Sequence, residues 1–145
     1  MSLRTVLDDP SKKNQLIEDC LRVLDAEVAD KRGLSGMAVK AGFKVVKGAK
    51  PGFLRAAITD LLPHFAEALE PLVAEANEKG EPVGTFLPRQ SSRVADALLA
   101  ITDRKAGGSS NRMVKGAYEK LRSTAKKHVE AAVPRVASLI ERHAG

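Results

Sequence analysis

Apolar residues recur at intervals of three or four along most of this sequence, the spacing that puts them on one face of an α-helix. Aromatic residues are scarce, with four Phe, one Tyr and no Trp, so the core must be built from aliphatic side chains, of which Ala and Leu dominate. Ala and Leu favour helix because they lose little conformational freedom in it. The sequence therefore predicts an all-α fold.

The length of the chain fits one domain. At 145 residues, a hydrophobic content of 43% is enough to build one continuous core. We therefore expect residues 1–145 to form a single compact helical bundle of about six helices with proline kinks.

Capping and turn residues divide the first part of the pattern into helices. The first helix should start at the Asp-Pro pair of residues 9–10 and end before Gly33. A second helix, capped by Ser35, should run to about Lys47 and is weakly specified because it contains interior glycines. A Lys-Pro-Gly turn at residues 50–52 should separate it from the next helical segment.

Three prolines fall inside segments with helical periodicity. A proline removes one backbone donor and clashes with the preceding turn. Because residues 51–78 contain Pro63 and Pro71, we expect this segment to be kinked or broken, as two helices that meet near Pro63. The last helix should run from about residue 111 towards residue 143, and Pro134 should kink or split it.

Glycine and proline also mark connections in the second half of the chain. Residues 79–88 are dense in both and are predicted to form a loop. The helix that follows should end at the glycine pair of residues 107–108. Ser109, Ser110 and Asn111 then offer caps for the last helix.

A short sequence pattern occurs twice. Val46-Lys47-Gly48-Ala49 recurs as Val114-Lys115-Gly116-Ala117. Such similarity can mark a duplicated unit, which predicts two weakly related segments at residues 33–79 and 107–144. The competing interpretation is chance, because Val, Lys, Gly and Ala are all common residues.

Positive charge is concentrated in two segments. The chain carries a formal net charge of +6. Residues 31–59 include seven basic residues and no acidic one, and residues 104–127 include eight basic residues and a single acidic one, Glu119. Segregated positive charge indicates binding to a polyanion, whereas a solvated lysine-rich helix surface is the competing interpretation.

The spacing of the cations within these segments predicts a basic face. Lys40, Lys44 and Lys47 lie on one side of a helix, and Arg122 and Lys126 lie on one side of another. If the two helices pack together, their cations merge into one positive surface. The residues of this predicted basic face are Lys40, Lys44, Lys47, Arg122 and Lys126.

A second candidate site lies where the glycine pair leads into the last helix. Free N–H groups at a helix start, hydroxyls and cationic side chains are groups that bind phosphate. The competing interpretation is an ordinary connection with serine caps. The candidate anion-binding residues are Arg104, Lys105, Ser109, Ser110, Arg112 and Lys115.

Recognisable catalytic and metal-binding motifs are missing from the sequence. The single cysteine, Cys20, falls on the apolar side of a helix, and His64, His128 and His143 lack partners at ligand or catalytic spacing. Glycine patterns for phosphate or dinucleotide binding are also missing. We therefore expect a protein that is not an enzyme and that uses no metal or cofactor. The alternative is an active site assembled from residues far apart in the chain.

Two functional hypotheses follow. The first is a helical binding protein whose basic faces contact polyanions such as nucleic acid. The second is a structural or interaction protein, acting as a homo-oligomer or on a membrane or hydrophobic surface. Residues 36–48, apolar on one side and lysine-bearing on another, suit the membrane surface. Without a signal peptide or an apolar stretch long enough to span a bilayer, we expect a cytoplasmic protein.

Overall fold

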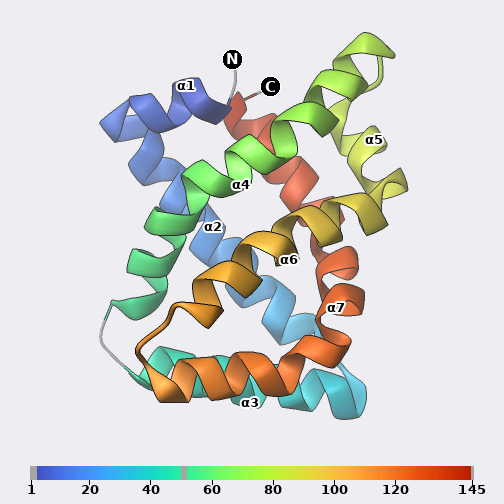
Figure 1. Cartoon of the computed structure of the whole chain (residues 1–145). Helices are drawn as coiled ribbons and strands as arrows, with labels where there is room; N and C mark the ends of the chain where they lie inside the picture. Colours follow the sequence, from blue (N-terminus) through green and yellow to red (C-terminus); the bar gives the residue numbers. More distant parts are fainter. Residues whose placement is uncertain (1–2, 50–51, 145) are drawn as a thin grey trace.

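Helices make up nearly the whole of the structure (Figure 1). The structure, a computed structural model, describes residues 3–49 and 52–144, and within these residues it has seven helices and no strand. The helices are α1 (Leu3–Asp8), α2 (Pro10–Asp30), α3 (Gly33–Ala49), α4 (Phe53–Glu78), α5 (Val83–Arg89), α6 (Ser91–Gly107) and α7 (Arg112–Ala144). The all-α prediction is confirmed. The structure differs from it in having two additional short helices, α1 and α5, and in having one helix, α4, where two were expected.

The start of α2 follows the predicted capping pattern. Asp9 is the N-cap, and its carboxylate accepts hydrogen bonds from the backbone N–H groups of Ser11 at 3.0 Å and Lys12 at 3.3 Å. Pro10 occupies the first helical position, where its missing N–H costs nothing. The helix ends at Asp30, just before Gly33.

The beginning of α3 differs from the prediction. The helix starts at Gly33 instead of being capped by Ser35, because Gly33 adopts a positive φ of 73°, which allows a sharp turn directly into the helix. Gly36 is buried, and a β-carbon there would lie 2.8 Å from the carbonyl carbon of Lys31. The predicted turn at residues 50–52 lies mostly outside the described residues.

The prediction that residues 51–78 form two helices meeting near Pro63 is wrong. Both Pro63 and Pro71 lie inside the single helix α4. Each proline removes only one backbone hydrogen bond. Packing of one buried face holds the helix together on both sides of the prolines, through Leu62, Leu69, Leu72 and Ala76.

The prediction that residues 79–88 form a loop is wrong in its second half, where Val83–Arg89 forms α5. Pro82 precedes this helix with a φ of −60°, close to the value required for helix entry. Phe86 and Leu87 are completely buried. Because burial of each side chain contributes about 1.5–3 kcal/mol, tertiary packing outweighs the local preference for a loop.

The buried residues form two clusters. The first draws on α4, α5, α6 and the second half of α7, and the second draws mainly on α1 and α2. The first cluster is Leu69, Leu72, Ala76, Phe86, Leu87, Val94, Val133, Ala137 and Ile140. The second is Val6, Leu16, Ile17, Leu62 and Leu139. None of the α3 residues that the structure describes belongs to either cluster.

The longest helix, α7, links the core to α3. Its second half supplies Val133, Ala137 and Ile140 to the first cluster. Its first half turns away from the core and runs beside α3 (Figure 1). The helix continues through Pro134, so this proline does not split it.

The two segments of the predicted repeat differ in local structure. Residues 33–79 contain two helices, α3 and α4, whereas residues 107–144 are mostly one helix, α7. The recurring Val-Lys-Gly-Ala pattern lies in α3 and in the first half of α7, which pack against each other. Duplication of a structural unit stays a prediction.

Candidate functional site

One end of the molecule is built from α3 and the first half of α7, which lie side by side at the bottom of Figure 1. The helices approach closely at Gly42, where a β-carbon would lie 2.7 Å from Cδ1 of Leu121. Lys31, just before α3, donates a hydrogen bond from Nζ to the backbone oxygen of His128 at 3.1 Å. We call α3 together with residues 112–128 the α3–α7 end.

One side of α3 is apolar and faces solvent. Leu34 is 88% exposed, Met37 is 66% exposed and Val45 is 38% exposed. These residues, with the exposed Ala38 and Ala41, follow helical spacing and therefore share one side of the helix. The opposite side, which carries Val39, Phe43 and Val46, is half-buried. Helix α3 thus has more apolar side chains than it packs against the rest of the protein.

The neighbouring helix also carries an exposed apolar side chain. Met113, in the first turn of α7, is 60% exposed. Within residues 3–49 and 52–144, the large hydrophobic side chains classed as exposed are Leu34, Met37, Val45 and Met113. All four lie on the α3–α7 end. Exposed apolar surface that is concentrated in one place marks an interaction surface more often than scattered apolar residues do.

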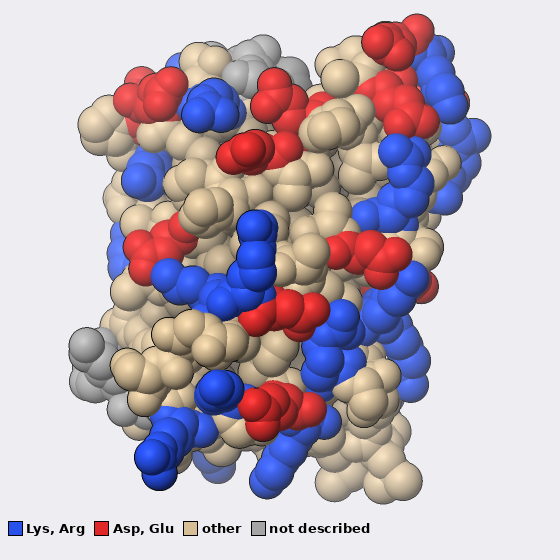
Figure 2. All heavy atoms as spheres, in the orientation of Figure 1, with Lys and Arg blue, Asp and Glu red and all other residues tan. Residues whose placement is uncertain are grey.

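Cations at this end largely lack carboxylate partners. The sequence of the α3–α7 end contains only one acidic residue, Glu119. Figure 2 shows Lys and Arg side chains predominating over acidic ones in the lower part of the molecule. Among the described residues, no ion pair is formed by Lys40, Lys44, Arg112, Lys115, Lys120 or Lys127.

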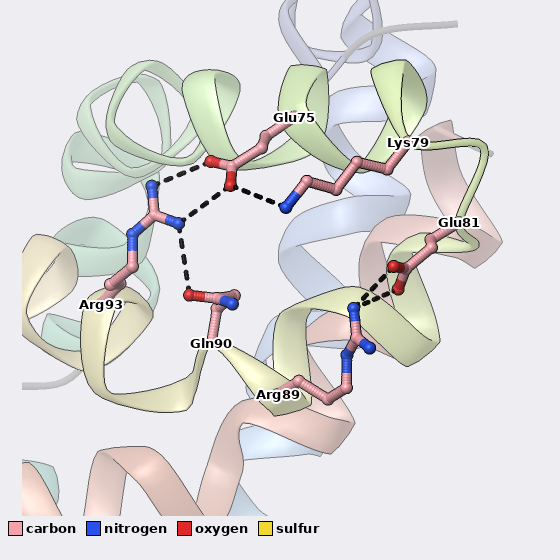
Figure 3. Close-up of polar contacts among 6 residues, drawn as sticks. All are labelled: Glu75, Lys79, Glu81, Arg89, Gln90 and Arg93. Atoms are coloured by element: carbon pink, nitrogen blue, oxygen red, sulfur yellow. Dashed lines mark hydrogen bonds and ion pairs between the residues drawn. The ribbon is translucent and has the colours of Figure 1, made fainter.

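At the opposite end, where α4, α5 and α6 meet, basic side chains are paired (Figure 3). The guanidinium of Arg93 contacts both carboxylate oxygens of Glu75, at 3.3 and 3.0 Å, and Lys79 lies 3.6 Å from the same carboxylate. The hydrogen bonds from Arg93 hold the pKa of Glu75 below its usual value. Arg89 similarly contacts Glu81 at 2.6 and 2.5 Å.

The second half of α7 is also tied down by ion pairs. Nη1 of Arg135 lies 2.9 Å from Oε1 of Glu27, and Nη2 lies 2.6 Å from Oδ2 of Asp30. These contacts join α7 to the last turn of α2. The hydrogen bond from Arg135 lowers the pKa of Asp30. Within the described part of α7, cations without an ion pair are therefore confined to its first half.

The structure brings the two helices of the predicted basic face together, but its members differ in their contacts. Lys40 and Lys44 are exposed and unpaired among the described residues. The other three contact carboxylates: Lys47 lies 3.4 Å from Asp25, Arg122 lies 2.8 Å from Asp103 and Lys126 lies 3.1 Å from Asp96.

Two further exposed lysines of α7 lie on a different side of the helix from Arg122 and Lys126. Lys120 and Lys127 follow Met113 at intervals of seven residues, so the three share one side of the helix. All three are exposed. The seven-residue spacing is visible in the sequence and is the signal that identifies them.

At the predicted anion-binding site, the helix start is occupied by the chain itself. Oδ1 of Asn111 accepts hydrogen bonds from the backbone N–H groups of Met113 at 3.1 Å and Val114 at 3.2 Å. The Oγ of Ser109 accepts one from the N–H of Asn111, while Ser110 is exposed.

The cations of the predicted anion-binding site also have separate surroundings. Lys105 lies 3.5 Å from Asp60, whereas Arg104 and Arg112 are exposed and Lys115 is half-buried. An anion at this helix start would have to displace the Asn111 cap.

One of the three histidines has a carboxylate partner: Nε2 of His143 lies 2.8 Å from Oδ2 of Asp19, which Arg142 also contacts at 2.9 Å. Burial, followed by the nearby Asp19 charge, raises the pKa of Cys20 to about 12, so its reactive thiolate is scarce at neutral pH. His64 is exposed on α4, and Nε2 of His128 is buried without a hydrogen-bond partner among the described residues. Within residues 3–49 and 52–144, no three His, Cys, Asp or Glu side chains are grouped as metal ligands would be.

The chain belongs to a family of unknown function (DUF6918), whose model matches residues 3–144. The matched region spans α1 to α7 and therefore includes both the core and the α3–α7 end. No curated protein and no solved structure matches the chain. Of the helices described, none combines the length and the apolar content needed to cross a bilayer.

Proposed function

We propose that this member of the family is a non-enzymatic binding protein that attaches to polyanions through its α3–α7 end. The observation that carries the proposal is the set of cations there that form no ion pair with any described residue, in contrast to the paired cations at the α4–α5–α6 end. A cation already held by a carboxylate must exchange that contact to bind a new anion, whereas an unpaired lysine does not.

The chemistry favours phosphate groups along an extended partner. Lysines on a helix side are separate point charges with flexible stems, so they neutralise phosphates without reading a particular shape. Phosphodiester groups are shared by nucleic acids and anionic lipid headgroups. Because the scarce aromatic residues offer little base stacking, single-stranded nucleic acid is the weaker candidate.

The proposal is tested by binding of the full chain to a labelled DNA duplex and to anionic vesicles over a series of salt concentrations. Binding should weaken steeply as salt rises, because screening and counterion release govern contacts between lysine and phosphate. At each salt concentration, the double substitution Lys40→Gln and Lys44→Gln should bind more weakly than the unmodified chain.

The matched control is Arg4→Gln with Lys13→Gln, which removes the same charge from the α1–α2 region. This control should weaken binding much less. Absence of binding to either polyanion at low salt would rule out the proposal. Equal loss in both double variants would instead show attraction by net charge alone, and the α3–α7 end would not be the binding surface.

A further inference from the structure

We infer that the polyanion contacted by the α3–α7 end is a lipid bilayer rich in anionic phospholipid, with α3 lying in the plane of its surface. This inference rests on the proposed function, and it names the partner. Its basis is the coincidence, on one short helix, of an exposed apolar side and a lysine-bearing side. Charge alone does not require Leu34, Met37 and Val45 to face outward.

The arrangement of α3 fits an interfacial helix. At about 1.5 Å per residue, its 17 residues span about 25 Å, and the exposed apolar positions from Leu34 to Val45 cover much of that length. Lys40 and Lys44 are exposed next to this apolar side. Long lysine stems can keep the ammonium among headgroups while neighbouring apolar side chains enter the acyl boundary.

The packing of α3 leaves its exposed apolar side available for contact with a bilayer. Its half-buried side, with Phe43 and Val46, holds it against the rest of the protein, and the close approach at Gly42 seats it on α7. Its apolar side contributes to neither core cluster. Met113 and the exposed Lys120 and Lys127 repeat the same combination on the adjacent helix.

Two other occupants fit the surface less well. In a symmetric pair of chains joined through this face, the unpaired lysines of one copy would approach those of the other, and Glu119 is the only acidic residue in the sequence of the α3–α7 end. A DNA duplex would satisfy the lysines but would leave Leu34 and Met37 facing a strongly hydrated phosphate backbone. A bilayer satisfies both kinds of side chain.

The test uses the full chain and vesicles of phosphatidylcholine, either alone or with about one third phosphatidylglycerol, in a sedimentation assay. Binding should require the anionic lipid. Leu34→Ser with Met37→Ser should reduce partitioning onto anionic vesicles by about tenfold or more, because it removes apolar area from the acyl boundary. The same variant should bind a DNA duplex as the unmodified chain does. Ala74→Ser with Ala100→Ser, at exposed positions elsewhere, is the control and should change neither.

A fluorescent reporter adds an independent measurement. The chain has no Trp, so Met37→Trp places a single indole on the apolar side of α3. Its emission should shift to shorter wavelength with anionic vesicles and should be quenched by brominated acyl chains. Ala74→Trp, on α4, is the matched control and should show neither effect.

The outcomes separate this inference from the proposed function. Binding to DNA without binding to vesicles would overturn the membrane assignment and leave polyanion binding standing. Binding to neither would overturn both. Vesicle binding that is unchanged by the Leu34 and Met37 substitutions would overturn the insertion of α3. Self-association in sedimentation velocity that the same substitutions abolish would assign the face to a second copy of the chain.

Discussion

The Cδ1 methyl of Leu121 lies 2.7 Å from the position that a β-carbon on Gly42 would occupy, so α3 and α7 meet where one helix has no side chain. Gly42→Ala should gain about 1 kcal/mol of helix propensity but lose about 1–3 kcal/mol to overpacking against Leu121. The matched control is Gly116→Ala, because a β-carbon there meets nothing within 4 Å. Urea unfolding should therefore show Gly116→Ala to be the more stable of the two. Equal stabilisation by both would mean that Leu121 yields freely and that the contact does not fix the helix pair.

Stability should depend strongly on α5 and little on the exposed side of α3. Phe86 is completely buried in the first core cluster, so Phe86→Ala should lower the free energy of unfolding by about 3–5 kcal/mol through loss of packing and formation of a cavity. Met37→Ala, at an exposed position, should change it by about 0.5 kcal/mol or less. Chemical denaturation of the two variants compares them directly. A comparable loss in Met37→Ala would show that α3 is part of the stabilising core after all.

His128 should make the protein less stable at mildly acidic pH. Burial, together with the charges of Lys31 and Lys127, lowers the pKa of His128. Below about pH 6.5 the unfolded chain therefore binds a proton more readily than the folded protein does. The contribution of neutral His128 to the free energy of unfolding is fully present above that pH, and it is lost as the pH falls through the pKa of His128 in the folded state.

Urea unfolding from pH 7.5 to about pH 5.5 measures this effect before most carboxylates titrate. His128→Gln should flatten the dependence, whereas His64→Gln, on the exposed surface of α4, should leave it unchanged. A steep decline that persists in His128→Gln would assign the acid sensitivity to another group.

Cys20 should react slowly in the folded protein. Burial and the neighbouring Asp19 raise the pKa of its thiol to about 12, and alkylating reagents attack the thiolate. At pH 8, iodoacetamide should modify the unfolded chain much faster than the native protein, as followed by mass spectrometry. Similar rates in both states would contradict the burial of this side chain on α2.

Local sequence signals predicted the elements whose determinants are local. Asp9 and Pro10 specify the start of α2, and the structure has the corresponding cap. At α5, by contrast, glycine and proline indicate a loop, while the burial of Phe86 and Leu87 between distant helices decides in favour of helix. Pro63 likewise remains within α4 because packing compensates for one lost hydrogen bond. These outcomes depend on tertiary contacts, which cannot be predicted from a short stretch of sequence.

The candidate surface could be predicted in part for the same reason. The lysine spacing of α3 identifies Lys40 and Lys44, since a helix side follows from sequence alone. Which cations stay unpaired does not follow, because Lys47 meets Asp25 and Lys126 meets Asp96 only through the packing of separate helices. The outward orientation of Leu34 is also a tertiary property, as an apolar side of a helix is ordinarily the buried one.

None of the described α3 residues belongs to either core cluster. The residues that form the core are therefore different from those on the exposed side of α3. The stability of the fold depends mainly on buried side chains of α1, α2, α4, α5, α6 and the second half of α7. Under the proposed function, contact with a partner depends on the outward side of α3. Substitutions on the outward side of α3 can therefore alter that surface, and under the proposed function the affinity for a partner, while the buried core stays the same.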